Sequence, residues 1–193
     1  MSAGARPIER RLFVGLDLDE VARDACARAA ERLRAAGFAA TYEDAAKFHV
    51  TLAFLGNVAD VRCSDVVATM RQTALRRCAV DVVLDKLGAF PHERRPRIVY
   101  AGAREQGDGF RTLAAAVREA YEERGFHFFG DSVAHVTLAR VKAPQRPLPP
   151  IDIVPIPVRF ARLCAFESVF DKEKNTSRYE VFAQEVLGGS SEA

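Results

Sequence analysis

The strongest constraint on the fold is an internal repeat of a strand-like segment that carries a histidine and a threonine. The segments HVTLAFLG, residues 49–56, and HVTLARV, residues 135–141, share five consecutive residues. Each lies in the second half of a stretch whose hydrophobic pattern predicts a strand, a helix and a strand. An apolar strand has no reason of its own to carry His and Thr, so coincidence explains the match poorly. The repeat predicts two similar lobes, each giving one strand to a shared site.

Hydrophobic periodicity predicts three helices and eight strands between residues 11 and 185. Helices are expected at residues 20–36 after a capping Asp19, at 60–77, and from a capping Asp108 to Gly125. Strands are expected at residues 11–18, 48–55, 80–87, 97–101, 126–129, 134–141, 158–166 and 178–185. The strands at 80–87 and 97–101 are expected to pair around a basic turn, Pro91-His92-Glu93-Arg94-Arg95-Pro96. Residues 142–157 hold six of the nine prolines and predict a surface loop.

Composition limits the class of protein. A chain of 193 residues suits one domain or two small fused lobes. With 49% apolar residues it can form a sizeable core without disulfide or metal cross-links. The formal net charge of +2 is too small for a general nucleic-acid binder, so any contact with nucleic acid must come from a local cluster.

The cysteines and the chain ends predict a cytoplasmic protein. Cys26, Cys63, Cys78 and Cys164 have neither metal-ligand nor redox-motif spacing and are expected to be reduced thiols. Residues 1–9 contain no apolar stretch of the signal-peptide kind, and no run is long enough to span a membrane. We expect a flexible N-terminus at 1–9, a single two-lobed domain at 10–187 and a disordered tail at 188–193.

The two repeated segments predict a catalytic site. Side chains alternate along a strand, so His49 and Thr51 share one face, as do His135 and Thr137. Burying a strand face that carries an imidazole and a hydroxyl costs free energy unless both groups find hydrogen-bond partners. We therefore expect this face to line a polar cleft. One imidazole can accept a proton from water while the other donates one to a leaving oxygen. Two hydroxyls can hold the non-bridging oxygens of a phosphodiester, so the pattern indicates phosphodiester hydrolysis.

Other chemistries have weaker support. His92, in the basic turn, and His127, between two phenylalanines, lack the paired threonine and are poorer candidates. The chain has no P-loop, GxGxxG, HExxH or GxSxG motif. No carboxylate stands within the His-Thr motifs, so neither a bound metal nor another cofactor is expected.

At these residues the chain resembles the two-histidine phosphoesterase superfamily, and more closely its RNA 2′,3′-cyclic phosphodiesterases, historically called 2′-5′ RNA ligases. The resemblance includes RLFVGLDL, both HVTLA segments, LGAFPHERRPRIVYAG and FESVFDKEKNTSRYEVFA. It implies an α+β fold in which two pseudo-symmetric lobes, each an antiparallel sheet with outer helices, face each other across a central cleft. It also implies His49 as proton donor, His135 as proton acceptor, and Thr51 and Thr137 as phosphate ligands.

A third phosphate ligand, Arg140, is implied by the same resemblance. Strand parity puts Arg140 on the face opposite His135, so it could reach the phosphate only through a bulge or around the strand end. The expected activity is metal-independent hydrolysis of 2′,3′-cyclic phosphate ends of RNA or nucleotides to a 2′-phosphomonoester, by a monomer that does not bind membranes. The open alternatives are 2′-5′ RNA ligation at the same site, another small cyclic or ADP-ribose-type phosphodiester as substrate, and a non-catalytic nucleotide- or RNA-binding module.

Overall fold

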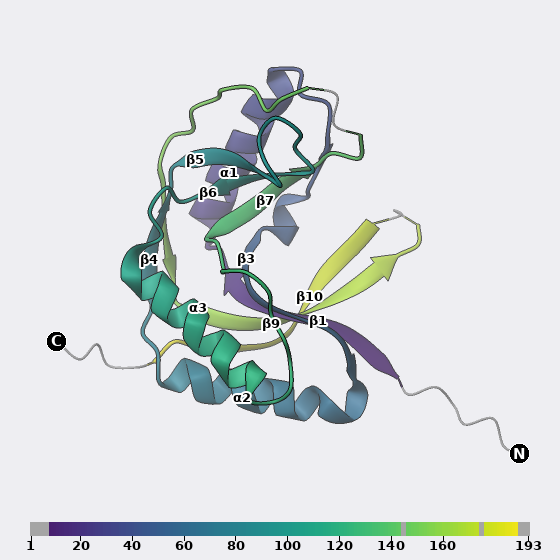
Figure 1. Ribbon diagram of the computed structural model, residues 1–193, viewed down its shortest axis with the longest axis vertical. Helices are drawn as coiled ribbons and strands as arrows, with labels where there is room; N and C mark the ends of the chain where they lie inside the picture. Colours follow the sequence, from purple (N-terminus) through teal and green to yellow (C-terminus); the bar gives the residue numbers. More distant parts are fainter. Residues whose placement is uncertain (1–7, 144–145, 174–175, 189–193) are drawn as a thin grey trace, which may run out of the picture.

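The computed structural model describes residues 8–143, 146–173 and 176–188 (Figure 1). Within these ranges the elements are, in chain order, β1 (Glu9–Asp17), α1 (Glu20–Ala35), β2 (Thr41–Tyr42), the 3-10 turn η1 (Ala45–Lys47), β3 (His49–Ala59), the 3-10 turn η2 (Asp60–Arg62), α2 (Cys63–Leu75), β4 (Val80–Leu84), β5 (Lys86–Phe90), β6 (Ile98–Gly102), α3 (Gly107–Glu122), β7 (His135–Arg140), β8 (Ile156–Phe160), β9 (Arg162–Asp171) and β10 (Thr176–Val186).

Two four-stranded sheets form the frame of the molecule. The first has the strand order β10-β9-β1-β3 and the second β2-β7-β6-β5, and neighbouring strands in both are antiparallel. β4 and β8 form a separate antiparallel pair. The repeated segments begin β3 in one sheet and β7 in the other, as the repeat predicted. The predicted α+β fold with two antiparallel sheets is confirmed.

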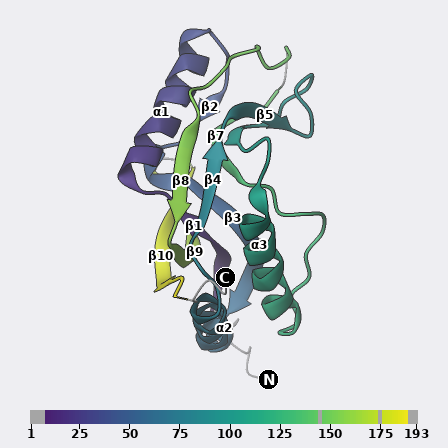
Figure 2. The same cartoon turned by 90° about the vertical axis from the view of Figure 1, so that its left-hand side faces the viewer.

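The helices cover the outer surfaces of the sheets (Figures 1 and 2). α1 follows a strand of the first sheet but contacts β7 of the second, whereas α2 contacts β9 and β10 and α3 contacts β3 and β4. The predicted cap of α1 is confirmed, because Asp19 Oδ1 accepts a hydrogen bond from the Ala22 N–H at 2.7 Å. Gly37, with a φ of 70°, follows the helix end and takes the left-handed conformation that glycine adopts without strain.

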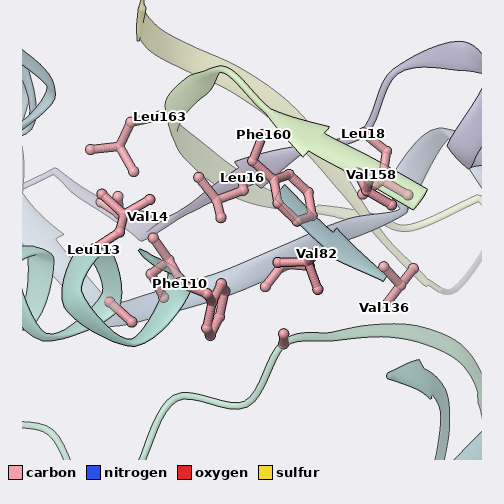
Figure 3. Close-up of a cluster of buried hydrophobic side chains, with 14 of the residues drawn as sticks. Val14, Leu16, Leu18, Val82, Phe110, Leu113, Val136, Val158, Phe160 and Leu163 are labelled. Carbon is pink, nitrogen blue, oxygen red and sulfur yellow. The ribbon is translucent and has the colours of Figure 1, made fainter. Parts of the chain in front are cut away.

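One large apolar core joins the two sheets (Figure 3). It includes Leu16 of β1, Val136 of β7, Phe160 of β8 and Phe110 of α3, all fully buried or nearly so. A side chain of this size stabilises the fold by about 1.5–3 kcal/mol when it leaves water. Because the same cluster contains residues of both sheets, the two His-Thr strands are held on one packed body.

Five sequence predictions were wrong in detail. Residues 126–129 are irregular, because Gly125 and Gly130 both have positive φ and leave no room for a ladder strand. The runs at 80–87 and 158–166 each divide between two sheets, so only β5 pairs with β6 across the basic turn. Helix α3 begins at Gly107, and Asp108 lies in its first turn instead of capping it. The helix predicted from residue 60 starts with the 3-10 turn η2.

The predicted flexible ends fall mostly outside the described residues. Of those described, Glu9 opens β1 and Gly188 forms an isolated β-bridge with Cys78. The cysteines form no disulfide, and burial raises the pKa of Cys26 to about 12 and of Cys164 to about 11. No helix of the described ranges is long and apolar enough to cross a membrane.

Candidate active site

A β-bulge follows each His-x-Thr sequence. In the β1–β3 pairing, Gly15 faces Thr51 and Val14 faces Ala53, so Leu52 is an extra residue. In the β6–β7 pairing, Tyr100 faces Thr137 and Val99 faces Ala139, so Leu138 is the extra residue. The burial patterns of residues 49–54 and 135–140 are identical as a result.

The bulge reverses the parity of the strand beyond it. Phe54 and Arg140, which occupy equivalent places after the two bulges, are thereby returned to the side of His49 and His135. This explains why strand parity alone put Arg140 on the wrong face. Its guanidinium instead lies close enough to His135 to lower the pKa of that imidazole.

His49 is held by its neighbours on both ring nitrogens. Nδ1 lies 2.6 Å from the Lys47 carbonyl oxygen and Nε2 lies 3.0 Å from Thr51 Oγ1. A carbonyl can only accept, so Nδ1 carries hydrogen and Nε2 of the neutral ring accepts from the hydroxyl. The ring lies among Phe13, Phe166 and Tyr179, with centroid distances of 4.8, 5.5 and 5.2 Å. The reactive nitrogen is therefore Nε2, beside Thr51.

His135 has the same Nδ1 contact in the second sheet. Its Nδ1 donates to the Val133 carbonyl at 2.8 Å, again two residues earlier in the chain. The ring meets Phe90 and Tyr100 edge-on, with centroids 5.1 and 5.3 Å away. Nε2 is thus the nitrogen left for chemistry in both histidines.

The electrostatic surroundings distinguish the two imidazoles. Burial lowers the pKa of both, because it penalises the charged ring. Among the weaker influences on the pKa of His49, the hydrogen bond to the Lys47 carbonyl raises it, the charge on His135 lowers it, and Asp17 and Glu43 raise it. Arg140 lowers that of His135. The two imidazoles therefore have different charged neighbours, and a charge on His135 disfavours a charge on His49.

A network that the sequence did not predict lies next to the histidines. Glu43, following β2, pairs with Arg140 Nε at 2.6 Å and with Lys47 Nζ at 3.4 Å. Lys47 also donates to Thr176 Oγ1 of β10 at 2.9 Å, which links the two sheets. Arg140 interacts with the Tyr179 hydroxyl, and Tyr179 packs against His49. Arg140 was already a candidate from the family resemblance, but Glu43, Lys47, Thr176 and Tyr179 share no sequence pattern with it, so no local signal could have identified them.

Of the five predicted site residues, Thr51 and His135 line a common cavity of about 450 Å³, whereas His49, Thr137 and Arg140 are not part of its wall. Thr51 and Phe54 come from β3, while His135 begins β7. The rest of the wall comprises Leu52, Phe90, Arg118, His127, Phe128, Phe129, Asp131, Ser132 and Val133. His127, judged a poor candidate from sequence, lies on this wall. His92 lies in a different hollow, where its Nδ1 accepts from the Arg95 N–H.

The described part of the chain contains no group of three or more His, Cys, Asp or Glu side chains that could hold a metal ion. The cavity wall offers the His135 imidazole and the Thr51 hydroxyl, with the His49 imidazole next to Thr51 and the Arg140 guanidinium near His135. Such a set can transfer protons and bind an anion of phosphate type.

Known proteins with similar sequences are cyclic phosphodiesterases. Residues 16–100 match the family model described as LigT-like phosphoesterase. The chain is 30% identical over 132 residues to the RNA 2′,3′-cyclic phosphodiesterase of Archaeoglobus fulgidus, covering 68% of this chain and 73% of the relative. It is 26% identical over 162 residues to the Thermotoga maritima protein of the same name, covering 82% and 86%.

Solved structures have the same fold. A Thermus thermophilus protein aligns with a TM-score of 0.79 at 27% identity, covering 93% of this chain and 98% of that one. Apo LigT of Escherichia coli aligns with a TM-score of 0.76 at 23% identity, with the same coverage of both chains.

Proposed function

Because the chain belongs to the family of LigT-like phosphoesterases, we propose that it hydrolyses 2′,3′-cyclic phosphodiester ends of RNA or nucleotides to a 2′-phosphomonoester. The observation that carries this proposal is the pair of His-x-Thr strands from different sheets, of which Thr51 and His135 line one cavity. The names of the relatives support the substrate class.

In the proposed reaction, His135 is the base and His49 the acid. Neutral Nε2 of His135 takes a proton from water, and the water oxygen attacks phosphorus. The bond from phosphorus to O3′ breaks, and Nε2–H of charged His49 protonates the departing oxygen. The carboxylates near His49 and the guanidinium near His135 support this division of roles. Solvent then returns both rings to their starting states.

The hydroxyls and Arg140 hold the phosphate. In the neutral state the Thr51 hydroxyl donates to His49 Nε2. Protonation of that nitrogen makes it the donor, so the hydroxyl hydrogen becomes available to a non-bridging oxygen. Thr137 serves the same purpose from β7, and Arg140 adds a positive charge where negative charge develops. Protonation of His49 therefore also frees the Thr51 hydroxyl to donate to a phosphate oxygen.

The aromatic wall supports a nucleotide over a smaller cyclic phosphodiester. Phe54 and Phe129, both on the cavity wall, are 48% and 96% exposed. Exposed rings beside a phosphate site are suited to stack on a nucleobase, worth about 1–3 kcal/mol per base.

A product analysis tests the proposal. The purified chain is incubated with nucleoside 2′,3′-cyclic phosphates, an RNA ending in such a phosphate, and ADP-ribose 1″,2″-cyclic phosphate. Products are compared by phosphorus NMR with authentic 2′- and 3′-nucleotides. Turnover of the first two to 2′-phosphates is expected. A 3′-phosphate product would reverse which oxygen faces His49, and turnover of ADP-ribose cyclic phosphate alone would change the substrate class.

A further inference from the structure

The turn between β5 and β6 presents two adjacent arginines, Arg94 and Arg95. In the described ranges nine arginines form ion pairs with carboxylates. Arg94 and Arg95 are exposed, and neither guanidinium has a hydrogen-bond or ion-pair partner within those ranges. Two like charges on neighbouring residues repel each other, so a bound anion would stabilise this arrangement.

The backbone of the turn is held in place. Arg95 N donates to the His92 carbonyl at 3.2 Å, and Arg97 N donates to the Phe90 carbonyl at 2.7 Å. From outside the turn, Leu148 N donates to the Glu93 carbonyl at 2.8 Å. The two guanidinium groups therefore extend from an ordered support, which lowers the entropy lost when they bind a ligand.

The turn adjoins the proposed active site. Arg94 and Arg95 line a hollow of about 710 Å³ whose wall also includes Tyr100. The other side of Tyr100 contacts the His135 ring. Figure 2 shows the β5–β6 turn on the same side of the molecule as the segment 126–134, part of which lines the catalytic cavity. An extended ligand leaving the cavity past Phe90 and Tyr100 would meet the two arginines next.

More positive charge lies at the ends of the neighbouring strands. Arg97 precedes β6 and donates to the Lys142 carbonyl just beyond β7. Both residues are exposed, and Glu93 is the one carboxylate in the described part of the turn. For a chain whose net charge is only +2, this is a marked local concentration of positive charge.

We propose that the β5–β6 turn binds the backbone phosphates of single-stranded RNA on the 5′ side of the terminal cyclic phosphate, with Arg94 and Arg95 as the principal contacts. This inference rests on the proposed function. It makes RNA chains better substrates than mononucleotides, because only a chain reaches the turn. Phosphate contacts of this kind supply affinity without sequence preference and weaken as salt displaces them.

The test compares two substrates in matched variants. kcat/KM is measured for a nucleoside 2′,3′-cyclic phosphate and for a short oligoribonucleotide with the same end, at about 50 and about 200 mM salt. The double variant Arg94→Ala/Arg95→Ala is expected to lose activity on the oligonucleotide and to keep that on the mononucleotide. Loss of two phosphate contacts should reduce the slope of log kcat/KM against log salt concentration by about 1.4 for the oligonucleotide. Raising the salt fourfold should therefore lower kcat/KM of the native chain by a factor about seven times larger than that of the variant.

The matched control is Arg76→Ala/Arg77→Ala. This second pair of adjacent arginines follows α2, at the opposite end of the molecule from β5 (Figure 1). The control variant removes the same charge and should leave the ratio of kcat/KM for the two substrates unchanged. The variant Arg94→Lys/Arg95→Lys keeps both charges and should keep the native salt slope. Equal losses on both substrates, or an equal effect of the control, would overturn the inference. If the native chain hydrolyses neither substrate, the proposed function is wrong and the inference fails with it.

Discussion

Replacing Gly88 by alanine should damage catalysis through a neighbour of His135. A methyl group at this position would lie 2.6 Å from both Cζ and Oη of Tyr100, and 2.8 Å from Cε2. Carbon atoms in good contact are about 3.6 Å apart, so the ring must move by about 1 Å. Tyr100 is only 8% exposed and lies between Gly88, Phe90 and His135. Movement of the ring toward Phe90 and His135 would displace the imidazole.

The expected cost has two parts. Overpacking of this kind lowers the free energy of unfolding by about 1–3 kcal/mol, which corresponds to a Tm lower by roughly 2–12 °C. Misplacing a catalytic group by about 1 Å lowers the rate about 100-fold, or roughly 2.7 kcal/mol of barrier. Activity should therefore fall far more than the folded fraction does.

The assay is kcat/KM on a nucleoside 2′,3′-cyclic phosphate at 25 °C, with Tm measured in parallel. Gly109→Ala is the control, because a methyl group there meets Val80 Cγ1 at an ordinary 3.5 Å. A double-mutant cycle with Tyr100→Leu isolates the contact, since without the ring the alanine should cost little further. Native kcat/KM in Gly88→Ala, or the same loss in the Tyr100→Leu background, would refute this reasoning.

Four further outcomes are expected. His49→Ala and His135→Ala should each lower kcat by about 10² to 10⁴, with the double variant little worse, and a near-native rate in either would remove that histidine from the mechanism. Burial lowers the pKa of both imidazoles below their usual value of about 6.5. The bell-shaped pH profile of kcat/KM should therefore be centred below about pH 6.5. An optimum above about pH 7.5 would contradict this expectation. Arg140→Gln should lower kcat/KM by roughly 10- to 100-fold, the worth of a charged hydrogen bond, and an unchanged value would exclude phosphate binding by Arg140. Exhaustive dialysis against EDTA should leave turnover intact, whereas loss that Zn²⁺ or Mn²⁺ restores would show that the proposed mechanism is wrong.

Local sequence patterns were sufficient to predict the two strands that carry the His-x-Thr sequences. The alternation of side chains depends only on backbone geometry, so His49 with Thr51, and His135 with Thr137, could be assigned to common faces before any partner strand was known. The start of α1 was equally predictable, because the bond from Asp19 to Ala22 N is made within one turn.

Tertiary structure decided the details that depend on strand partners. The bulges at Leu52 and Leu138 are defined only by the register with β1 and β6, and they return Phe54 and Arg140 to the catalytic side. The division of residues 80–87 at Asp85 likewise depends on two different neighbouring strands, since β4 pairs with β8 and β5 with β6.

The electrostatic difference between the histidines also came from distant parts of the chain. The two motifs are nearly equivalent in sequence, and only the family resemblance assigned them different roles. In the folded protein Glu43 and Asp17 approach His49, while Arg140 approaches His135. Coulomb interactions act through distance in space, and the fold alone sets that distance for residues remote in sequence. The sequence by itself therefore determined which residues are candidates for proton transfer, and the tertiary structure decided which charged groups surround each imidazole.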